Sequence, residues 1–231
     1  MKVPLSPRLR ACCGFIAPGD RVADVGTDHG YLGIWLLLEG IARSVIASDV
    51  VPGPLSTARR NAGKYGVSDK MEFFLSDGVR EVPRDFDILV CAGMGGDTMV
   101  SILSDAPWLR DRKYRLVLQC QSKTPMLRRF LSETGWRIGE ETVVRDGRFL
   151  YTVMEVRWDP EYPRLTPMEW HFPPALLKNP APAVPQYYRW VLGGLKQVAA
   201  HKEDPQGEAV IRELEALAED PARKWLKEET L

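Results

Sequence analysis

Long apolar runs are absent from this chain of 231 residues. The longest run covers residues 34–38 and is closed by Glu39, which makes it far too short to cross a lipid bilayer. Two prolines and two arginines lie among the first ten residues, where the apolar stretch of a signal peptide would begin. The sequence therefore predicts neither a membrane-spanning segment nor a secretory signal.

Cysteine and histidine are scarce. The cysteines are Cys12, Cys13, Cys91 and Cys120, and the histidines are His29, His171 and His201. No two cysteines have C-x-x-C spacing. The adjacent pair could be redox-active, but we expect two small buried apolar side chains in a reduced, cytoplasmic setting. No histidine shares an element with a second ligand at metal-binding spacing, so we predict no metal site.

Net charge is also lacking, because Lys+Arg and Asp+Glu both total 31, and this excludes a histone-like coat of positive charge. Charge is nevertheless uneven along the chain. Residues 108–148 carry ten Lys/Arg against five Asp/Glu, which marks them as a patch for phosphate, although a solvated helix face would have the same composition. The residues that we predict to contact a polyanion are Arg8, Arg110, Arg112, Lys113, Arg128 and Arg129.

Three common motifs are missing from the chain. It has no G-x-G-x-x-G turn, which disfavours a dehydrogenase, and no P-loop or G-x-S-x-G elbow, which disfavours a phosphotransferase or a serine hydrolase. What the composition does contain, 45% hydrophobic and 27% charged residues, is typical of a folded globular protein. The length indicates one domain, or one domain with an appendage.

The apolar pattern alternates between the periods of strands and helices. It predicts strands at 21–26, 44–49, 71–75, 86–92, 114–119, 136–144 and 149–156, and helices at 31–39, 54–65, 96–103 and 125–133. The dipeptide Asp146-Gly147 separates the last two strands and predicts a tight turn between them. The order indicates an α/β fold whose mostly parallel sheet of seven strands ends in a hairpin.

The composition changes near residue 158. Residues 159–185 contain eight prolines, so we expect no regular structure there. Helical spacing returns at 187–200 and 207–218, which predicts an antiparallel hairpin carried by a proline-rich tether. We therefore divide the chain into a domain of residues 1–158 and a helical, coiled-coil-like domain of residues 159–231.

The most informative stretch follows the first predicted strand. There Asp24, Gly26, Asp28 and Gly30 surround a turn that leads directly into a helix. Glycines let a ligand approach the backbone, but two carboxylates would repel a pyrophosphate. They suit a ligand with positive charge, such as the ammonium and sulfonium groups of S-adenosylmethionine. A purely structural turn would explain the glycines as well.

Two further acids follow the second and third predicted strands. Asp49 lies about twenty residues after the turn, where nucleotide-binding α/β folds place an acid against two ribose hydroxyls, although it could instead cap the following helix. Val50 would then flank the adenine. Asp77 and Gly78 could lie at the amino group of that adenine, but ordinary turn chemistry explains this dipeptide equally well.

The segment after the fourth predicted strand contains Ala92, Gly93 and Met94, followed by two more glycines. Bare backbone at the carboxyl edge of a parallel sheet is where ligands of open α/β folds bind. The thioether of Met94 can pack against a flat ring. A glycine-rich start to the next helix is the structural alternative.

Taken together, these motifs resemble one family. The runs Val22-Ala23-Asp24-Val25-Gly26-Thr27-Asp28-His29-Gly30-Tyr31-Leu32, Ala47-Ser48-Asp49, Asp77-Gly78 and Ala92-Gly93-Met94-Gly95-Gly96 are similar to those of the bacterial tRNA (adenine-N1)-methyltransferases that act at position 22. The likeness extends to Leu5-Ser6-x-Arg8-Leu9 and to the tail from Trp170 through Tyr188. It implies a class I, Rossmann-like methyltransferase fold with S-adenosylmethionine as cofactor and tRNA as partner.

The resemblance implies roles for the residues above. The cofactor would be held by Asp24, Gly26, Thr27, Asp28, Gly30, Asp49, Val50, Asp77, Gly78, Ala92, Gly93 and Met94. His29, Tyr31 and Met94 would position the target base, and the protein would act as a monomer. The run Gln119-Cys120-Gln121 departs from the Gln-Pro that is usual in the family, which puts base recognition in doubt. The alternatives are a methyltransferase for another RNA, a protein or a small molecule, and a nucleotide-binding module without turnover.

Overall fold

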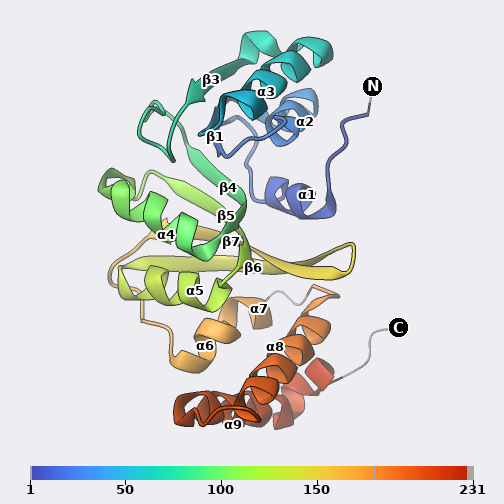
Figure 1. Ribbon diagram of the computed structural model, residues 1–231, viewed down its shortest axis with the longest axis vertical. Coiled ribbons are helices and arrows are strands. Elements are labelled where there is room, and N and C mark those ends of the chain that lie inside the picture. Colours follow the sequence, from blue (N-terminus) through green and yellow to red (C-terminus); the bar gives the residue numbers. More distant parts are fainter. Residues whose placement is uncertain (1, 179–180, 228–231) are drawn as a thin grey trace.

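The structure is a computed structural model that describes residues 2–178 and 181–227. One sheet of seven strands runs through the molecule in the order β3-β2-β1-β4-β5-β7-β6 (Figure 1). The strands are β1 Asp20–Val25, β2 Ala42–Asp49, β3 Met71–Leu75, β4 Ile88–Gly95, β5 Arg115–Ser122, β6 Trp136–Asp146 and β7 Phe149–Trp158. The first five are parallel, and β7 is antiparallel to both of its neighbours. The predicted fold class is confirmed.

Helices cover both faces of this sheet. They are α1 Pro7–Cys13, α2 Tyr31–Leu38, α3 Pro52–Tyr65, α4 Gly96–Asp105 and α5 Thr124–Glu133, with 3-10 turns η1 Ser68–Lys70 and η2 Pro107–Leu109. Alternate residues of β4 separate into two cores: Leu89 and Cys91 pack with α4 and α5, whereas Ile88 and Val90 pack with α1 and α2. The four cysteines are buried free thiols, as expected, and burial raises the pKa of Cys13 to about 12.

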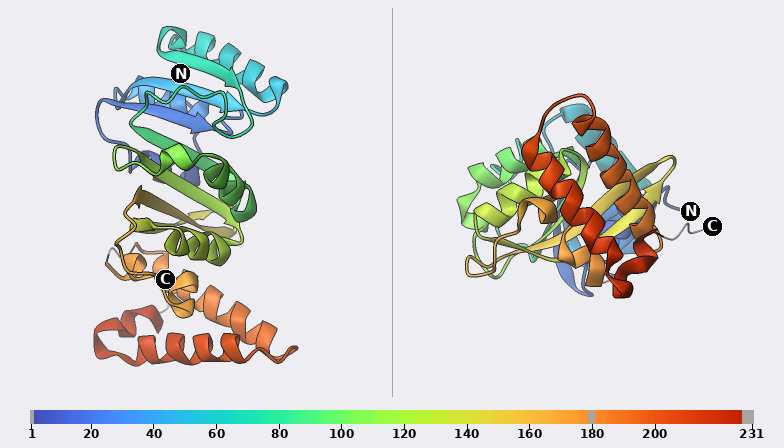
Figure 2. Two further views of the ribbon diagram at one scale, coloured as in Figure 1. Left: turned by 90° about the vertical axis from the view of Figure 1, so that its left-hand side faces the viewer. Right: turned by 90° about the horizontal axis from the view of Figure 1, so that it is seen from below.

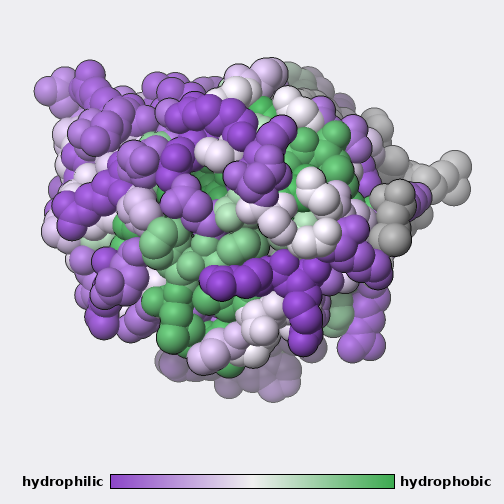
Figure 3. Space-filling view, turned by 90° about the horizontal axis from the view of Figure 1, so that it is seen from above, coloured by the Kyte–Doolittle hydropathy of each residue, from purple (hydrophilic) through white to green (hydrophobic). Residues whose placement is uncertain are grey.

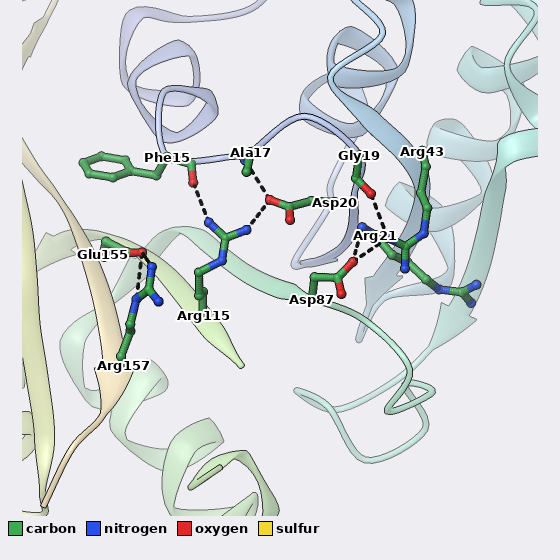
Figure 4. A network of polar contacts seen from close by, with 10 residues as sticks. All are labelled: Phe15, Ala17, Gly19, Asp20, Arg21, Arg43, Asp87, Arg115, Glu155 and Arg157. Atoms are coloured by element: carbon green, nitrogen blue, oxygen red, sulfur yellow. Dashed lines mark hydrogen bonds and ion pairs between the residues drawn. The ribbon is translucent and has the colours of Figure 1, made fainter. Parts of the chain in front are cut away.

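A polar network ties the amino edge of the parallel strands together (Figure 4). Arg115, at the start of β5, forms an ion pair with Asp20 at the start of β1 and donates to the carbonyl oxygen of Phe15. Asp87, just before β4, accepts from the backbone N–H of Arg21 at 2.7 Å and pairs with Arg43 at 2.7 Å. This edge is closed by its own side chains, which leaves the opposite, carboxyl edge for ligands.

The prediction that residues 159–185 lack regular structure is wrong. They contain α6 Pro167–His171 and α7 Pro174–Lys178, and α8 Val184–Ala199 begins before the last of the eight prolines. Each helix has a proline in its first turn, where the missing N–H costs no hydrogen bond. Thr166 also forms a capping box with Glu169, which fixes the start of α6.

The C-terminal helices form the predicted hairpin, but they are not carried on a loose tether. α8 packs against α9 Pro205–Glu219 and the 3-10 turn η3 Pro221–Lys227, at the end of the molecule beyond β6 (Figure 2). A third core joins this hairpin to the sheet, because Phe172, Leu176 and Tyr187 bury their side chains with Val143 of β6. No helix in the described part of the chain is both long enough and apolar enough to span a membrane.

Candidate functional site

The turn between β1 and α2 has an unusual backbone. Gly26, Asp28 and Gly30 all have positive φ, at 72°, 52° and 74°. The φ of Gly26 is one that L side chains rarely adopt, and a Cβ there would lie 2.3 Å from Cε of Met94, so a larger residue would strain the backbone and displace the Met94 methyl group. The N–H groups of Gly26 and Thr27 both donate to the carbonyl oxygen of Ser48 at 2.9 Å. The turn is therefore fixed to the end of β2.

Asp24 lies beneath this turn and is 4% exposed. Its Oδ2 accepts a hydrogen bond from the hydroxyl of Thr27 at 2.7 Å. Burial raises the pKa of Asp24 to about 6, the Thr27 hydrogen bond opposes that rise, and the nearby charge of Asp49 adds to it. A buried carboxylate that has no ion-pair partner among the described residues is suited to receive a cation from a ligand.

Asp49 ends β2 and is held by two backbone groups. Its Oδ2 accepts from the N–H of Asp28 at 3.1 Å, and its Oδ1 accepts from the N–H of Val51 at 2.9 Å. Since a carboxylate oxygen can accept more than one hydrogen bond, both oxygens keep capacity for a ligand. The helix-capping alternative is not what the structure shows: the N-cap residue of α3 is Val51, and its start has no side-chain cap.

The end of β4 carries a bulge at Gly93, where the pairing with β5 shifts between Ala92 and Met94. The fully buried Gln119 of β5 fixes this bulge, because its Oε1 accepts from the N–H of Gly93 and from Nη1 of Arg8, both at 3.0 Å. Arg8 also pairs with Asp146 at 3.5 Å. We had assigned Arg8 to phosphate contacts, and the structure instead places it beside the β4 bulge.

These elements enclose a cavity of about 280 Å³ at the carboxyl edge. Its walls contain eight of the residues predicted to hold the cofactor or the base: Asp24, Gly26, Thr27, Asp28, His29, Tyr31, Ala92 and Gly93. Arg8, Leu9 and Leu32 complete the lining. The clustering follows from the sheet, because Val25 pairs with Ser48 on one side and with Cys91 on the other, which brings the three strand ends side by side.

His29 and Tyr31 form a pair of rings in the lining of this cavity. Their centroids are 5.8 Å apart with planes inclined by 57°, and the His29 side chain is 53% exposed. The carbonyl oxygen of His29 accepts from the amide of Asn61 of α3 at 2.9 Å, which steadies the turn. Asp28 lies 3.7 Å from the His29 ring and is 67% exposed. Both rings are therefore available to an incoming planar group.

The remaining predicted cofactor residues do not line the cavity. Gly30 packs against Ala58 of α3, and the methyl group of Met94 lies against Gly26. Val50 is 60% exposed. The backbone next to Asp77 lies beside Asp49, because the N–H of Ser76 donates to the carbonyl oxygen of Asp49. The carboxylate of Asp77 instead pairs with Arg80 at 3.1 Å. The roles of Asp49, Val50, Asp77, Gly78 and Met94 stay predictions.

The predicted phosphate contact of Arg128 is wrong. Its side chain is fully buried, its Nη1 donates to the carbonyl oxygens of Trp170 and His171 at 2.9 Å, and its Nη2 lies 2.6 Å from Glu141 and 3.3 Å from the hydroxyl of Tyr187. Arg128 therefore joins α5 to α6 and α8 and cannot reach a solvent phosphate. Sequence spacing alone could not distinguish this buried arginine from the exposed Arg129 beside it.

The other basic residues lie apart from the cavity. Arg110, Arg112 and Lys113 precede β5, at the amino edge of the sheet, whereas the cavity is at the carboxyl edge. Arg112 pairs with Asp159 at 3.7 Å, and Arg110 lies over the Trp158 ring at 5.4 Å. Arg129 pairs with Glu133. Their phosphate contacts stay predictions, but these residues do not surround the cavity.

A larger cavity of about 620 Å³ lies elsewhere, on the outer strands β6 and β7 beside α7. It is lined mainly by charged side chains, of which Arg157 and Glu155 already pair at 2.8 Å. Size alone does not make it the site, because it lies away from the aligned ends of the parallel strands. Among the described residues, no group of three His, Cys, Asp or Glu side chains could hold a metal ion.

Comparison with known proteins places this geometry in a family. The model of the family described as "Methyltransferase domain" matches residues 5–154. A curated tRNA (adenine(22)-N(1))-methyltransferase of Bacillus subtilis is 28% identical over 154 residues, which is 66% of this chain and 65% of that enzyme. The chain thus matches a little under two thirds of the length of this curated relative.

Solved structures resemble the whole chain. A Streptococcus pneumoniae protein in complex with S-adenosyl-L-methionine superposes with a TM-score of 0.78 and 25% identity, over 96% of this chain and 98% of that one. The m1A22 tRNA methyltransferase of Bacillus subtilis superposes with a TM-score of 0.77 over 98% and 100% of the two chains, at 23% identity, which shows the fold alone. Both matches extend over the C-terminal helices.

Proposed function

The chain belongs to the methyltransferase domain family, and from that premise we propose that it transfers a methyl group from S-adenosylmethionine to N1 of adenine 22 in tRNA. The observation that carries the proposal is the cavity at the carboxyl edge, where two carboxylates of the β1 turn share one lining with the guanidinium of Arg8. The likeness to a tRNA (adenine(22)-N(1))-methyltransferase supports the choice of substrate.

The cavity fits this cofactor by charge. The methionine end of S-adenosylmethionine carries two cations and one carboxylate, and the cavity offers Asp24 and Asp28 for the cations and Arg8 for the carboxylate. Asp49 would accept both ribose hydroxyls with its remaining lone pairs. A pyrophosphate-bearing dinucleotide would instead meet two negative charges, which disfavours a dehydrogenase.

When bound, S-adenosylmethionine supplies a methyl group on a positively charged sulfur. N1 of neutral adenine has a free lone pair, so the chain needs no general base. It must align the two reactants, which contributes up to about 7–11 kcal/mol, and exclude water. It must also stabilise the positive charge that develops on the adenine ring. The exposed ring of His29 and the half-buried ring of Tyr31 offer faces for the base, and Asp28 adds negative charge beside them.

The region after residue 158 would hold the tRNA. Its helices are joined to the sheet by the hydrogen bonds of Arg128 and by the third core, which includes Val143 of β6. We propose that the protein acts as a monomer. The buried free thiols suit a reducing, cytoplasmic setting.

Purified protein incubated with methyl-labelled S-adenosylmethionine and unmodified tRNA tests the proposal. Digestion of the RNA and mass spectrometry should find 1-methyladenosine, and a transcript with guanine in place of adenine 22 should take up no label. Parallel incubations with ribosomal RNA and with bulk protein test the other acceptors. If the label enters only ribosomal RNA or only protein, that acceptor is the substrate and the proposal of tRNA is wrong.

A further inference from the structure

A third cavity, of about 310 Å³, lies where the methyltransferase sheet meets α8. Residues 120–125 after the middle of β5 and residues 150–152 of β7 form one side, and Trp190, Val191, Leu195 and Val198 are among the residues of the other. We name this cavity the α8 groove. Its described lining is mainly apolar and contains Lys123 and His171 but no carboxylate.

The described residues leave some apolar side chains of the α8 groove exposed. Trp190 is 65% exposed and Val198 is 57% exposed, although α8 buries Tyr187, Tyr188 and Val191 in the third core. The Trp190 ring lies 5.8 Å from the Tyr187 ring, so it is held beside a fixed aromatic neighbour. Exposed apolar groups gathered at one cavity usually mark a binding surface.

The α8 groove continues from the proposed active site. Gln119 holds the Gly93 bulge of the first cavity, and the next residues of β5, Cys120 and Gln121, line the groove. Nε2 of Gln121 lies 3.6 Å from the position that a Cβ on Gly93 would take. The last residues of β5 therefore lie between the two cavities, and the run Gln119-Cys120-Gln121 among them departs from the family pattern.

We propose that the α8 groove holds an unpaired nucleobase of the RNA, next to the methylated adenosine, stacked on Trp190. This inference rests on the proposed function. N1 belongs to the pairing edge, so the target must be unpaired or flipped when it reacts, and local opening leaves neighbouring bases unstacked. Proteins capture such bases on aromatic side chains and read their edges with polar groups. Gln121, Ser122 and Thr124 supply those polar groups.

The charges of the groove favour an occupant that carries phosphate over a basic peptide. Lys123 provides the positive charge that a phosphate beside the base requires, and its ion pair with Asp97 at 3.1 Å is exposed enough to exchange partners. Burial lowers the pKa of His171, and the charge of Arg128 lowers it further. Its ring is therefore neutral near pH 7 and can both donate to and accept from a base.

The test compares Trp190→Ala and Trp190→Phe with Leu38→Ala, a matched control at an exposed apolar residue of α2. Fluorescence anisotropy measures tRNA binding in the presence of S-adenosylhomocysteine. The Ala variant should weaken binding by roughly 5- to 150-fold, as expected for the loss of one stacked base. The Phe variant should keep most of the affinity. Thermal melts and S-adenosylhomocysteine affinity should be unchanged in all three variants.

Abasic nucleotides placed one at a time beside adenine 22 locate the base. One position should weaken binding to the wild type as strongly as Trp190→Ala does, and it should cause no further loss in that variant. If every variant binds tRNA within twofold of wild type, or if no abasic position is coupled to Trp190, the inference is wrong. If Trp190→Ala changes the self-association of the protein but not its tRNA binding, the groove binds a second copy of the chain instead.

Failure of this inference differs from failure of the proposed function. If the groove holds no base, wild type and Leu38→Ala still methylate tRNA, and Trp190→Ala does so with the same KM. If the proposed function is wrong, the wild type itself places no label in tRNA.

Discussion

The buried carboxylate of Asp24 should destabilise the ligand-free protein. Its pKa rises from an ordinary value of 3.8 to about 6 because of burial, against the opposing hydrogen bond from Thr27. A shift of about two units corresponds to roughly 3 kcal/mol of folding free energy. Because the folded-state pKa is the higher one, the penalty is absent below about pH 3.8, grows as the pH rises towards 6, and is constant above that.

Replacing Asp24 with Asn removes this penalty and keeps the geometry, since the amide oxygen can still accept from the Thr27 hydroxyl. We expect Asp24→Asn to raise the free energy of unfolding by about 2–3 kcal/mol more at pH 8 than at pH 4. Urea unfolding of both proteins at intervals across this range measures the difference. Asp28→Asn, at a 67% exposed carboxylate of the same cavity, is the matched control and should stay within about 0.5 kcal/mol.

The same substitution should weaken cofactor binding, because the cation loses a carboxylate partner. A gain in stability together with a loss of binding is typical of a residue kept for function. If the stability difference between Asp24→Asn and the wild type does not change with pH, the ionised Asp24 carboxylate does not destabilise the folded protein. Lower stability of Asp24→Asn at pH 8 would lead to the same conclusion, because it would mean that the native structure stabilises the charged form.

Four further predictions concern the cofactor, the base, the RNA and the core. Asp49→Ala should lose about 1.5–3 kcal/mol of S-adenosylmethionine affinity in calorimetry, whereas the exposed Asp69→Ala should lose none, and equal affinities would contradict the ribose assignment. Tyr31→Ala should reduce the methylation rate, and an unchanged rate would remove Tyr31 from the site. Affinity for tRNA should fall steeply as salt rises, and a flat response would exclude phosphate contacts. Arg128→Met should lower the free energy of unfolding in urea by about 3–5 kcal/mol, because Glu141 then stays buried without its ion-pair partner. The double variant with Glu141→Leu should recover most of that loss. A single variant as stable as wild type would contradict the buried ion pair.

The clustering of the acids and glycines was predictable from the sequence. Each of these residues lies at the carboxyl end of a strand or within a few residues of it, and the carboxyl ends of neighbouring parallel strands meet at one edge. Once β1, β2 and β4 are adjacent, Asp24, Asp28 and Gly93 must come together. Local sequence patterns were enough for this prediction, because the order of the parallel strands determines which strand ends are neighbours.

Contacts between distant parts of the chain were not predictable. Arg8 and Gln119 are 111 residues apart, and nothing in either segment indicates that one hydrogen bond joins them. The burial of Arg128 depends on Glu141 of β6 and on the carbonyl oxygens of Trp170 and His171. The helical pattern around Arg128 does not indicate these partners. Each contact requires the complete topology before its partners become neighbours.

Residues 159–185 show a different limit. Prolines lower helix propensity, yet Pro167 and Pro174 occupy first turns, where the ring costs nothing. Their number indicated an irregular tether, whereas their positions fit two short helices.

The exposed side chains seen over the β3 end of the molecule are mostly hydrophilic, with an apolar area between them that no sequence pattern had indicated (Figure 3).

The central claim is that the cavity at the carboxyl edge binds a sulfonium nucleoside. Calorimetric titration of S-adenosylmethionine into the wild type and into Gly26→Val tests it most directly, because the φ of 72° at position 26 strains a β-branched side chain and a Cβ there would displace the Met94 methyl group. The account predicts one site per wild-type chain and no measurable binding in a folded Gly26→Val protein. Equal binding by the two proteins, or no binding by the wild type, would contradict it.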